Sequence, residues 1–276
     1  MIAHSTWNFE DPDLVSAIDE LPLWSAPFGQ ALLDAVALKP HLQVLDIGSG
    51  LGFPALQLAQ LLGPTSTVFV LDPWQAALTR LQLKMDQYGL SNVRIASGVA
   101  EHMAFEDESF DLITSNNGLN NVQDLRQAWS ECRRVAKPGA QLVLTENLPG
   151  TMLEFYSCFK STLSELELTE YLPAVDSHIH SKRKPIEETR QIIGESGFKI
   201  VQEKHGRFIM RFLDGSAMIN SFLIRLAFLP SWKGLLPEER QDGVFEKVET
   251  ALNAKAAEKG ELDLTIPFVC LDCRRL

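Results

Sequence analysis

The run that most constrains the fold is Val44-Leu45-Asp46-Ile47-Gly48-Ser49-Gly50-Leu51-Gly52, in which a short apolar stretch ends on three alternating glycines. An apolar run of this length with glycines behind it is typical of a buried β-strand. Glycines at the end of such a strand allow a tight turn and a close approach of the backbone to a ligand. The run therefore predicts either a nucleotide-binding loop or a simple tight turn.

Short apolar runs alternate with amphipathic segments from about residue 42 to 146. The expected strands are residues 42–47, 67–71, 93–96, 110–114 and 141–145, and the expected helices are 54–62, 74–88 and 124–136. Pro138-Gly139 is expected to form a turn before the fifth strand. Strands that alternate with helices need crossover connections, so the pattern predicts a mainly parallel sheet with helices on both faces.

The pattern changes after residue 146. Helical segments are expected at 151–172, 185–195, 216–229 and 237–258, and strands at 197–201, continuing toward 212, and at 262–273. The predicted fold class is α/β, with a Rossmann-like, mainly parallel seven-stranded sheet and helical lid insertions after strands five and six. We expect one domain over residues 1–276, with a helical cap (1–40), a core (41–146), a lid segment (147–197) and C-terminal strands (198–276) around a helical insertion (214–258).

The formal net charge of −11 argues against a nucleic-acid partner, because binding a phosphate backbone requires a basic surface. The one basic run, Lys182-Arg183-Lys184, is short and is expected to be a solvated face. No apolar stretch has the length that a membrane span needs, and nothing near Met1 resembles a secretory signal. A cytoplasmic protein is therefore expected.

Two acidic residues narrow the choice of ligand. Asp46 precedes the glycines, where a carboxylate would repel a pyrophosphate but would suit a ligand with an ammonium group. Phe53 stands where a dinucleotide-binding turn has its third glycine. Asp72 ends the second strand, where it is suited either to accept hydrogen bonds from both hydroxyls of a ribose or to cap the next helix. These features favour a cofactor with an amino-acid end over NAD.

Five motifs occur in order: residues 46–52, the acidic strand end at 72, Ala100-Glu101-His102-Met103-Ala104-Phe105, Phe110-Asp111-Leu112-Ile113, and residues 134–140. Together they resemble the class I S-adenosylmethionine-dependent methyltransferases, in particular the branch of quinone-biosynthesis enzymes. The resemblance covers about residues 25–146. The run Gly118-Leu119-Asn120-Asn121-Val122 is also similar to a segment of that branch, with Asn120 in place of an arginine.

The resemblance implies S-adenosylmethionine as cofactor and S-adenosylhomocysteine as product. It places the methionine part against Gly48 and Gly50 with Asp46 near the ammonium group, the ribose at Asp72, and the adenine beside Pro73 and Trp74. The family commonly has an aspartate for the adenine amino group where this chain has Val99, so backbone groups and packing, or Glu101 or His102, would replace it. The full set of implied cofactor residues is Asp46, Gly48, Ser49, Gly50, Gly52, Asp72, Pro73, Trp74, Val99, Ala100, Glu101, Asn116 and Asn117.

Methyl transfer needs a general base only if the acceptor must lose a proton. The candidate bases are His178 and His180, and the basic run that follows them would then grip an acidic or phenolic acceptor; the other interpretation is a polar loop. Two histidines without a third ligand do not define a metal site, so no metal is expected.

An acceptor pocket is expected to be partly apolar, and packing of amphipathic helices is the equally good interpretation of the same residues. The candidate pocket residues are Trp24, Phe28, Asn120, Asn121, Met152 and Tyr156. Three functions follow from the sequence: transfer of a methyl group to a small organic molecule, binding of the cofactor without catalysis, and an NAD-dependent oxidoreductase. Fold analogy does not name the acceptor.

Overall fold

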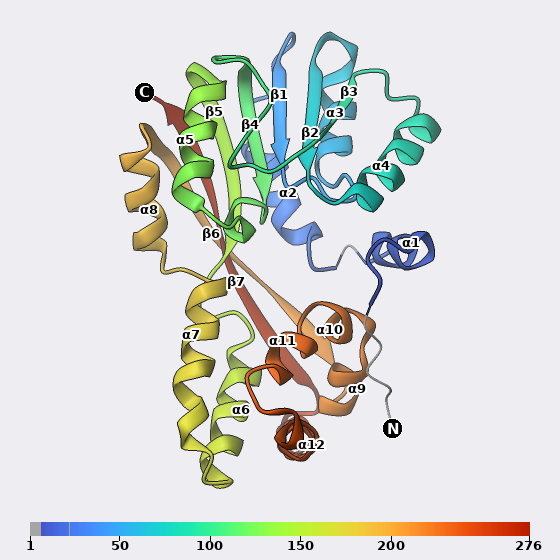
Figure 1. The fold of residues 1–276 in the computed structure, drawn as a ribbon, viewed down its shortest axis with the longest axis vertical. Coiled ribbons are helices and arrows are strands. Elements are labelled where there is room, and N and C mark those ends of the chain that lie inside the picture. Colours follow the sequence, from blue (N-terminus) through green and yellow to red (C-terminus); the bar gives the residue numbers. More distant parts are fainter. Residues whose placement is uncertain (1–6, 22) are drawn as a thin grey trace. The chain divides into compact units, whose positions relative to one another are not determined.

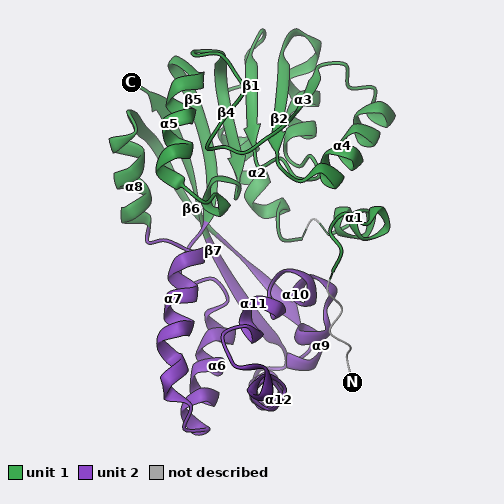
Figure 2. Ribbon diagram, in the orientation of Figure 1, with its two compact units in different colours: residues 1–146, 186–206, 268–276 green, residues 147–185, 207–267 purple. Residues whose placement is uncertain are grey.

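The computed structural model describes residues 7–21 and 23–276. These residues form two compact units, coloured separately in Figure 2. Unit 1 comprises residues up to 146 together with 186–206 and 268–276, and unit 2 comprises 147–185 and 207–267. The expectation that the whole chain acts as one domain stays a prediction.

Seven strands form one sheet in the order β3-β2-β1-β4-β5-β7-β6 (Figure 1). They are β1 (Gln43–Ile47), β2 (Thr67–Asp72), β3 (Val93–Ser97), β4 (Phe110–Asn116), β5 (Ala136–Asn147), β6 (Phe198–Phe212) and β7 (Leu262–Arg275). β1 pairs in parallel with β2 and β4, and β3 and β5 continue the parallel pairing outward. The predicted fold class is therefore confirmed, with β6 and β7 as the one antiparallel hairpin.

The helices of unit 1 enclose an apolar core. They are α1 (Pro12–Asp19), α2 (Ala26–Ala35), α3 (Ala55–Leu62), α4 (Gln75–Tyr88), α5 (Leu125–Val135) and α8 (Ile186–Glu195). Side chains from α2, α3 and α4 pack with strand residues such as Val44, Val68 and Leu112 in one buried cluster. α5 and α8 lie side by side, and Trp129 of α5 meets Phe198 of β6 edge to face at 5.4 Å between ring centroids (Figure 1).

The predicted turn at Pro138-Gly139 is wrong, because both residues lie within β5. β5 has an irregularity at this point in its pairing with β4, and Gly139 has a positive φ of 77°. Phe110 pairs with Ala136, whereas Leu112, two residues later, pairs with Gln141. The extra residues on the β5 side form an irregularity of the bulge type, at which a strand bends and the extra residues stay out of the ladder.

Unit 2 is mainly helical. Its helices are α6 (Leu153–Glu165), α7 (Leu172–Lys182), α9 (Gly215–Asn220), α10 (Phe222–Ala227), α11 (Leu229–Lys233) and α12 (Glu238–Lys259). The predicted single helix over 151–172 is wrong at its end, because α6 stops at Glu165 and the polar segment with the two histidines forms the separate helix α7. The predicted helix over 216–229 is likewise divided into α9 and α10 at Ser221. None of the described helices has the length and apolar character that crossing a bilayer requires.

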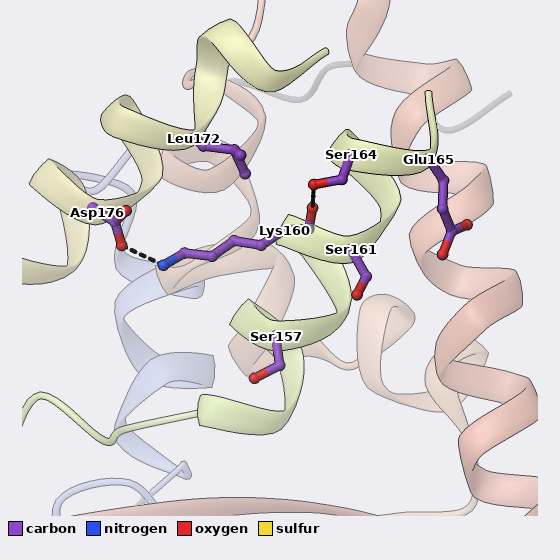
Figure 3. Close-up of a pocket in the computed structure, with 7 residues that line it drawn as sticks. All are labelled: Ser157, Lys160, Ser161, Ser164, Glu165, Leu172 and Asp176. Atoms are coloured by element: carbon purple, nitrogen blue, oxygen red, sulfur yellow. Dashed lines mark hydrogen bonds and ion pairs between the residues drawn. The ribbon is translucent and has the colours of Figure 1, made fainter. Parts of the chain in front are cut away.

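Unit 2 carries a hollow of about 520 Å³ on its polar surface (Figure 3). An ion pair between Lys160 of α6 and Asp176 of α7 crosses it. The other lining residues are Ser157, Ser161, Ser164, Glu165 and Leu172. None of the site residues expected from the sequence lines this hollow.

Candidate cofactor-binding site

The loop after β1 depends on its three glycines. Gly48, Gly50 and Gly52 have φ angles of 73°, 49° and 100°, which is backbone that residues with a side chain rarely adopt. A Cβ on Gly52 would stand 2.9 Å from the Leu56 side chain, so this glycine lets α3 pack against the loop. A Cβ on Gly50 would meet nothing within 4 Å. Gly50 therefore presents its backbone to open space, as a ligand-binding loop requires.

The loop is also held from the neighbouring strand β4. Ser115 donates from its hydroxyl to the Ile47 carbonyl at 3.0 Å and accepts from the Leu119 backbone N–H at 2.9 Å. A Cβ on Gly118 would stand 2.3 Å from the same Ile47 carbonyl oxygen. The chain after β4 therefore lies directly on the end of β1, and a glycine at 118 is required for that approach.

Asp72 joins the glycine loop to the end of β2. Its Oδ2 accepts a hydrogen bond from the Gly50 backbone N–H at 2.8 Å, and its Oδ1 accepts one from the Trp74 backbone N–H at 2.8 Å. The side chain is buried, with 8% of its surface exposed. Both carboxylate oxygens retain further acceptor capacity, since each can take a second hydrogen bond. Asp72 therefore shapes the loop, and its carboxylate stands beside the loop as a charged hydrogen-bond acceptor.

Asp46 is a buried carboxylate beside the same loop. It is 1% exposed, and its Oδ1 accepts a hydrogen bond from the Thr114 hydroxyl at 2.6 Å. Burial, with a smaller contribution from the charge of Asp72, raises the pKa of Asp46 to about 6. Thr114 was not singled out from the sequence; its role depends on the β1–β4 pairing, which brings it opposite Asp46.

Trp74 is held by the N-terminal segment. Its ring nitrogen donates to the Phe9 carbonyl at 2.8 Å, and the two rings meet edge to face at 6.0 Å between centroids. Nearby, Asp19 forms ion pairs with Arg80 at 2.9 Å and with Lys84 at 2.8 Å. Residues before the first strand are thereby tied to α4 and to Trp74 at its start.

The chain after β3 differs from the expected adenine site. Val99 is 43% exposed, and Ala100 is buried. The Glu101 carboxylate accepts hydrogen bonds from the backbone N–H groups of Gln123, at 2.8 Å, and Asp124, at 3.2 Å. Glu101 thus holds the start of α5. Its proposed role toward adenine, like that of the exposed His102, stays a prediction.

Four asparagines gather at the carboxyl end of β4. Asn116 accepts from the Thr145 hydroxyl at 2.8 Å and donates to the Ser25 carbonyl at 3.3 Å. Asn117 has a positive φ of 56°, and its carbonyl accepts from the Asn121 amide at 2.6 Å. The Asn120 amide lies 3.4 Å from the Asn117 side-chain oxygen. The structure thus brings together in unit 1 the asparagines that the sequence assigned to the methionine end and to the acceptor.

Two aromatic candidates for the acceptor pocket also lie in unit 1. Trp24 and Phe28 meet edge to face at 5.5 Å between ring centroids. Phe28 is fully buried and packs against Phe268 at 5.1 Å. Phe28 therefore serves the core, and its contact with an acceptor stays a prediction.

The remaining candidates belong to unit 2. Met152 and Tyr156 are buried, and Met152 has a positive φ of 56° at the start of α6. His178 and His180 lie on α7, so the interpretation as a polar loop is wrong; His180 is exposed and His178 is half-buried. Burial first, then the charges of Arg183 and Lys182, lowers the pKa of His178.

Comparison with known proteins agrees with this geometry. Residues 45–144 match the family model described as a methyltransferase domain. The demethylmenaquinone methyltransferase of Bacillus cytotoxicus is 34% identical over 118 residues, which are 43% of this chain and 50% of that protein. The same enzyme of Geobacillus kaustophilus is 35% identical over 113 residues, covering 41% of this chain and 48% of that protein. The matched stretch thus spans about half the length of these relatives.

Solved structures agree on the fold. A putative methyltransferase from Bacillus halodurans superposes with a TM-score of 0.57 at 17% identity, covering 90% of this chain and 98% of that one. The family match begins within β1 and ends within β5, and it contains the glycine loop, Asp72 and the asparagine cluster. Residues 45–144 of this chain therefore match a methyltransferase domain.

Proposed function

We propose that this protein transfers a methyl group from S-adenosylmethionine to a small organic acceptor. The observation that carries the proposal is the hydrogen bond from the Gly50 N–H to Asp72, inside the stretch that matches the methyltransferase domain. This hydrogen bond holds the glycine loop and the Asp72 carboxylate, which can accept hydrogen bonds from hydroxyl groups, at the carboxyl ends of adjacent parallel strands. Sheets of this kind bind ligands at that edge.

The residues fit the cofactor. The open space at Gly50 accommodates a ligand that a Cβ would exclude. Asp72 has acceptor capacity for ribose hydroxyls. Asp46 has its pKa raised to about 6, and an ammonium group nearby would stabilise its charged form. Asp46, Gly48, Ser49, Gly50, Gly52 and Asp72 would therefore hold the cofactor, with Pro73, Trp74, Val99, Ala100 and Glu101 around the adenine and Asn116 and Asn117 at the methionine end.

The reaction needs little from the protein beyond alignment. S-adenosylmethionine supplies a methyl group bonded to a positively charged sulfur, which is reactive by itself. The chain's residues would bind and orient the two partners in line and exclude water. If the acceptor loses a proton, His178 is the proposed base, and burial lowers its pKa and so favours the neutral form that can accept a proton.

The acceptor is proposed to be a small molecule, because the net charge of −11 disfavours nucleic acid and the relatives that match are named for methylating demethylmenaquinone. The proposed acceptor contacts stay those expected from the sequence: Trp24, Phe28, Asn120, Asn121, Met152 and Tyr156. The similarity to demethylmenaquinone methyltransferases supports a quinone-like acceptor, and it covers about half the length of those enzymes.

NAD is a poorer ligand for this loop. The ring of Phe53, at the position where the dinucleotide fingerprint needs a glycine, fills the space beside Gly29, where a Cβ would stand 2.1 Å from it. Asp46 would also repel a pyrophosphate. Binding of S-adenosylmethionine without catalysis is the second candidate, favoured by the exposed Val99 in place of an adenine-binding carboxylate.

Methyl-labelled S-adenosylmethionine and a small-metabolite extract test the proposal. We expect label in one or a few small molecules, with S-adenosylhomocysteine formed in equal amount. Asp72→Asn should abolish the transfer, whereas Asp86→Asn, at an exposed site on α4, should leave it unchanged. Cofactor binding with no label transfer from any extract would favour the non-catalytic function.

A further inference from the structure

One lysine connects the glycine loop with the N-terminal helix α1, and all of these parts belong to unit 1. Lys84 of α4 donates from Nζ to the Leu51 carbonyl at 2.6 Å and to Asp19 Oδ1 at 2.8 Å. The side chain of Lys84 is 16% exposed and that of Asp19 is 12% exposed. A lysine ammonium is strongly hydrated and normally remains in water. The near-burial of this ammonium is therefore sustained by two acceptors, one of which belongs to the glycine loop.

Lys84 and Asp72 hold the glycine loop from two sides. Asp72, at the end of β2, accepts from the Gly50 N–H at 2.8 Å. Lys84, on the helix that follows, donates to the carbonyl of the next residue, Leu51. Glycine backbone reorients readily unless such contacts fix it. A charged donor on the Leu51 carbonyl therefore helps to keep the loop around Gly50 in one conformation before a ligand binds.

Asp19 fixes the position of Lys84. It is the last residue of α1, which packs against α4 (Figure 1), and its Oδ2 accepts from Arg80 at 2.9 Å. Arg80 and Lys84 lie four residues apart on α4, so they share a face and their like charges repel. A carboxylate in the last turn of a helix is unfavourable for that helix, because it lies at the negative end of the helix dipole. The two cations of α4 offset this cost, so the position of Asp19 depends on α4 and the restraint on Lys84 depends on α1.

The N-terminal segment is joined to the site by a second connection. The Phe9 carbonyl accepts from the Trp74 ring N–H, and the Trp74 backbone N–H donates to Asp72. Both connections join residues before β1 to the side chains that hold the glycine loop.

We propose that Lys84 is a positioning residue for S-adenosylmethionine, and that Asp19 acts through Lys84 to link the docking of α1 to cofactor affinity. The inference rests on the proposed function, which assigns the glycine loop to this cofactor. The link is reciprocal: α1 held against α4 favours the binding-competent loop, and a bound cofactor strengthens the hold on α1 by the same factor. Both residues act by holding the loop and take no part in methyl transfer.

Calorimetry with S-adenosylhomocysteine on the full chain measures the effect. Lys84→Met should lower the affinity at least about tenfold, and Lys84→Arg should recover most of it, because a guanidinium also donates to a carbonyl and a carboxylate together. Asp19→Asn should lower the affinity several-fold. In the double variant Asp19→Asn/Lys84→Met the loss should equal that of Lys84→Met alone, because Asp19 acts through Lys84.

Arg80→Met is the matched control. It removes the same charge from the same helix and breaks an ion pair with the same carboxylate, but it leaves the bond to Leu51 in place. The affinity should therefore change by less than about twofold.

An NMR signal reports on the loop without any cofactor. Leucine labelled with ¹³C at the carbonyl and glycine labelled with ¹⁵N mark two peptide bonds of the chain, Leu51–Gly52 and Leu62–Gly63. The chemical shifts of a peptide group respond to hydrogen bonding at its carbonyl, so Lys84→Met should move the first signal and leave the second in place. Arg80→Met should move neither. A Leu51–Gly52 signal that stays in place in Lys84→Met would contradict the bond that holds the loop.

Three calorimetric results would overturn the inference. One is an unchanged affinity in a folded Lys84→Met chain, and another is an equal loss in Arg80→Met, which would trace the effect to net charge or to the packing of α1. The third is a pair of losses, in Asp19→Asn and Lys84→Met, that add in the double variant. If Lys84→Met fails to fold, Asp19→Asn decides: an affinity equal to that of Arg80→Met contradicts the link to α1.

Failure of the proposed function is distinguishable from failure of this inference. A wild-type chain that binds no S-adenosylhomocysteine removes both together. Wild-type binding that Lys84→Met leaves unchanged removes only the positioning role of Lys84.

Discussion

The Cα of Gly118 lies 2.7 Å from the place that a Cβ on Gly48 would occupy. The loops after β1 and β4 therefore touch backbone to backbone at the carboxyl ends of neighbouring parallel strands. Such an approach excludes every side chain at both positions. It also separates two kinds of glycine in one loop, since Gly48 is required by the fold whereas Gly50 faces open space.

Replacing these two glycines by alanine should have different consequences, the first mainly for stability and the second mainly for cofactor affinity. Gly48→Ala combines a positive φ with a backbone collision and should cost about 3 kcal/mol or more of unfolding free energy. Gly50→Ala adds only the strained φ and should cost about 1 kcal/mol. Urea unfolding measures both. Because the new methyl group would occupy the open space, Gly50→Ala should fold and lose at least about tenfold in S-adenosylmethionine affinity. Unchanged affinity in Gly50→Ala would place the cofactor elsewhere.

Asp72→Asn should weaken both the loop and the cofactor. An amide has one acceptor oxygen, so it cannot accept from the N–H groups of Gly50 and Trp74 through separate oxygens as the carboxylate does. We expect a loss of about 1–3 kcal/mol in unfolding free energy, the cost of one buried donor left unsatisfied. S-adenosylmethionine affinity should fall by about a hundredfold or more, since the charged acceptor is also lost. If Asp72→Asn loses stability but keeps its affinity for S-adenosylmethionine, Asp72 has only the structural role of holding the loop and the start of α4.

Asp46 predicts a pH dependence with a definite sign. Its pKa is about 6 in the folded chain and 3.8 as the ordinary value, so the folded state binds more protons between these values. Stability from this group is therefore complete below pH 4 and is lost as the pH rises through 6, by roughly 3 kcal/mol at most. The difference between wild type and Asp46→Asn in urea unfolding from pH 4 to 8 isolates this slope. If the unfolding free energies of wild type and Asp46→Asn change equally with pH, the pKa of Asp46 is not raised in the folded chain.

The same group should link pH to cofactor affinity. A ligand ammonium group favours the charged carboxylate, so wild-type affinity for S-adenosylmethionine should fall as the pH drops from 7 to 5. Asp46→Asn should bind more weakly at pH 7 and show little change over this range. Calorimetry at three pH values checks this. A cofactor affinity that is independent of pH in wild type would contradict contact between Asp46 and the ammonium group.

The proposed base can be assigned by replacing each histidine. His178→Gln should lower kcat by about 10²-fold or more if the acceptor loses a proton in the reaction. His180→Gln, two residues further along the same helix and exposed, is the matched comparison and should have little effect. Because the pKa of His178 is lowered, wild-type kcat should be flat between pH 7 and 8. Equal, small effects of both changes would mean that the reaction needs no histidine.

The parts of the fold that are coded locally could be predicted. The strand before Gly48 and the helix before Gly89 follow from apolar runs that stop at glycine, and Gly89 does adopt the left-handed conformation that ends a helix, with φ 66°. The helix with His178 was missed because its second half, from Asp176 to Lys182, is largely polar and has no clear apolar face.

Contacts between distant residues could not be predicted. Nothing next to Gly118 in the sequence shows that it must lie against Ile47, because the contact exists only once β1 and β4 pair. The hydrogen bonds from Thr114 to Asp46, and from the backbone N–H groups of Gln123 and Asp124 to Glu101, likewise join residues that are far apart in the sequence. Arg183 is the sharpest case: a short basic run predicted exposure, but the middle residue is buried against Tyr156. A charge pattern does not reveal which member of a run faces inward.

The most direct test of the central claim is calorimetric titration of the wild-type chain with S-adenosylmethionine and, separately, with NAD. We expect one site per chain for S-adenosylmethionine with a dissociation constant of roughly 1–100 µM, and no heat with NAD. Gly50→Ala, checked for folding by urea unfolding, should lose the site. A folded chain that binds NAD, or that binds neither S-adenosylmethionine nor S-adenosylhomocysteine, would contradict the assignment of the glycine loop as an S-adenosylmethionine site.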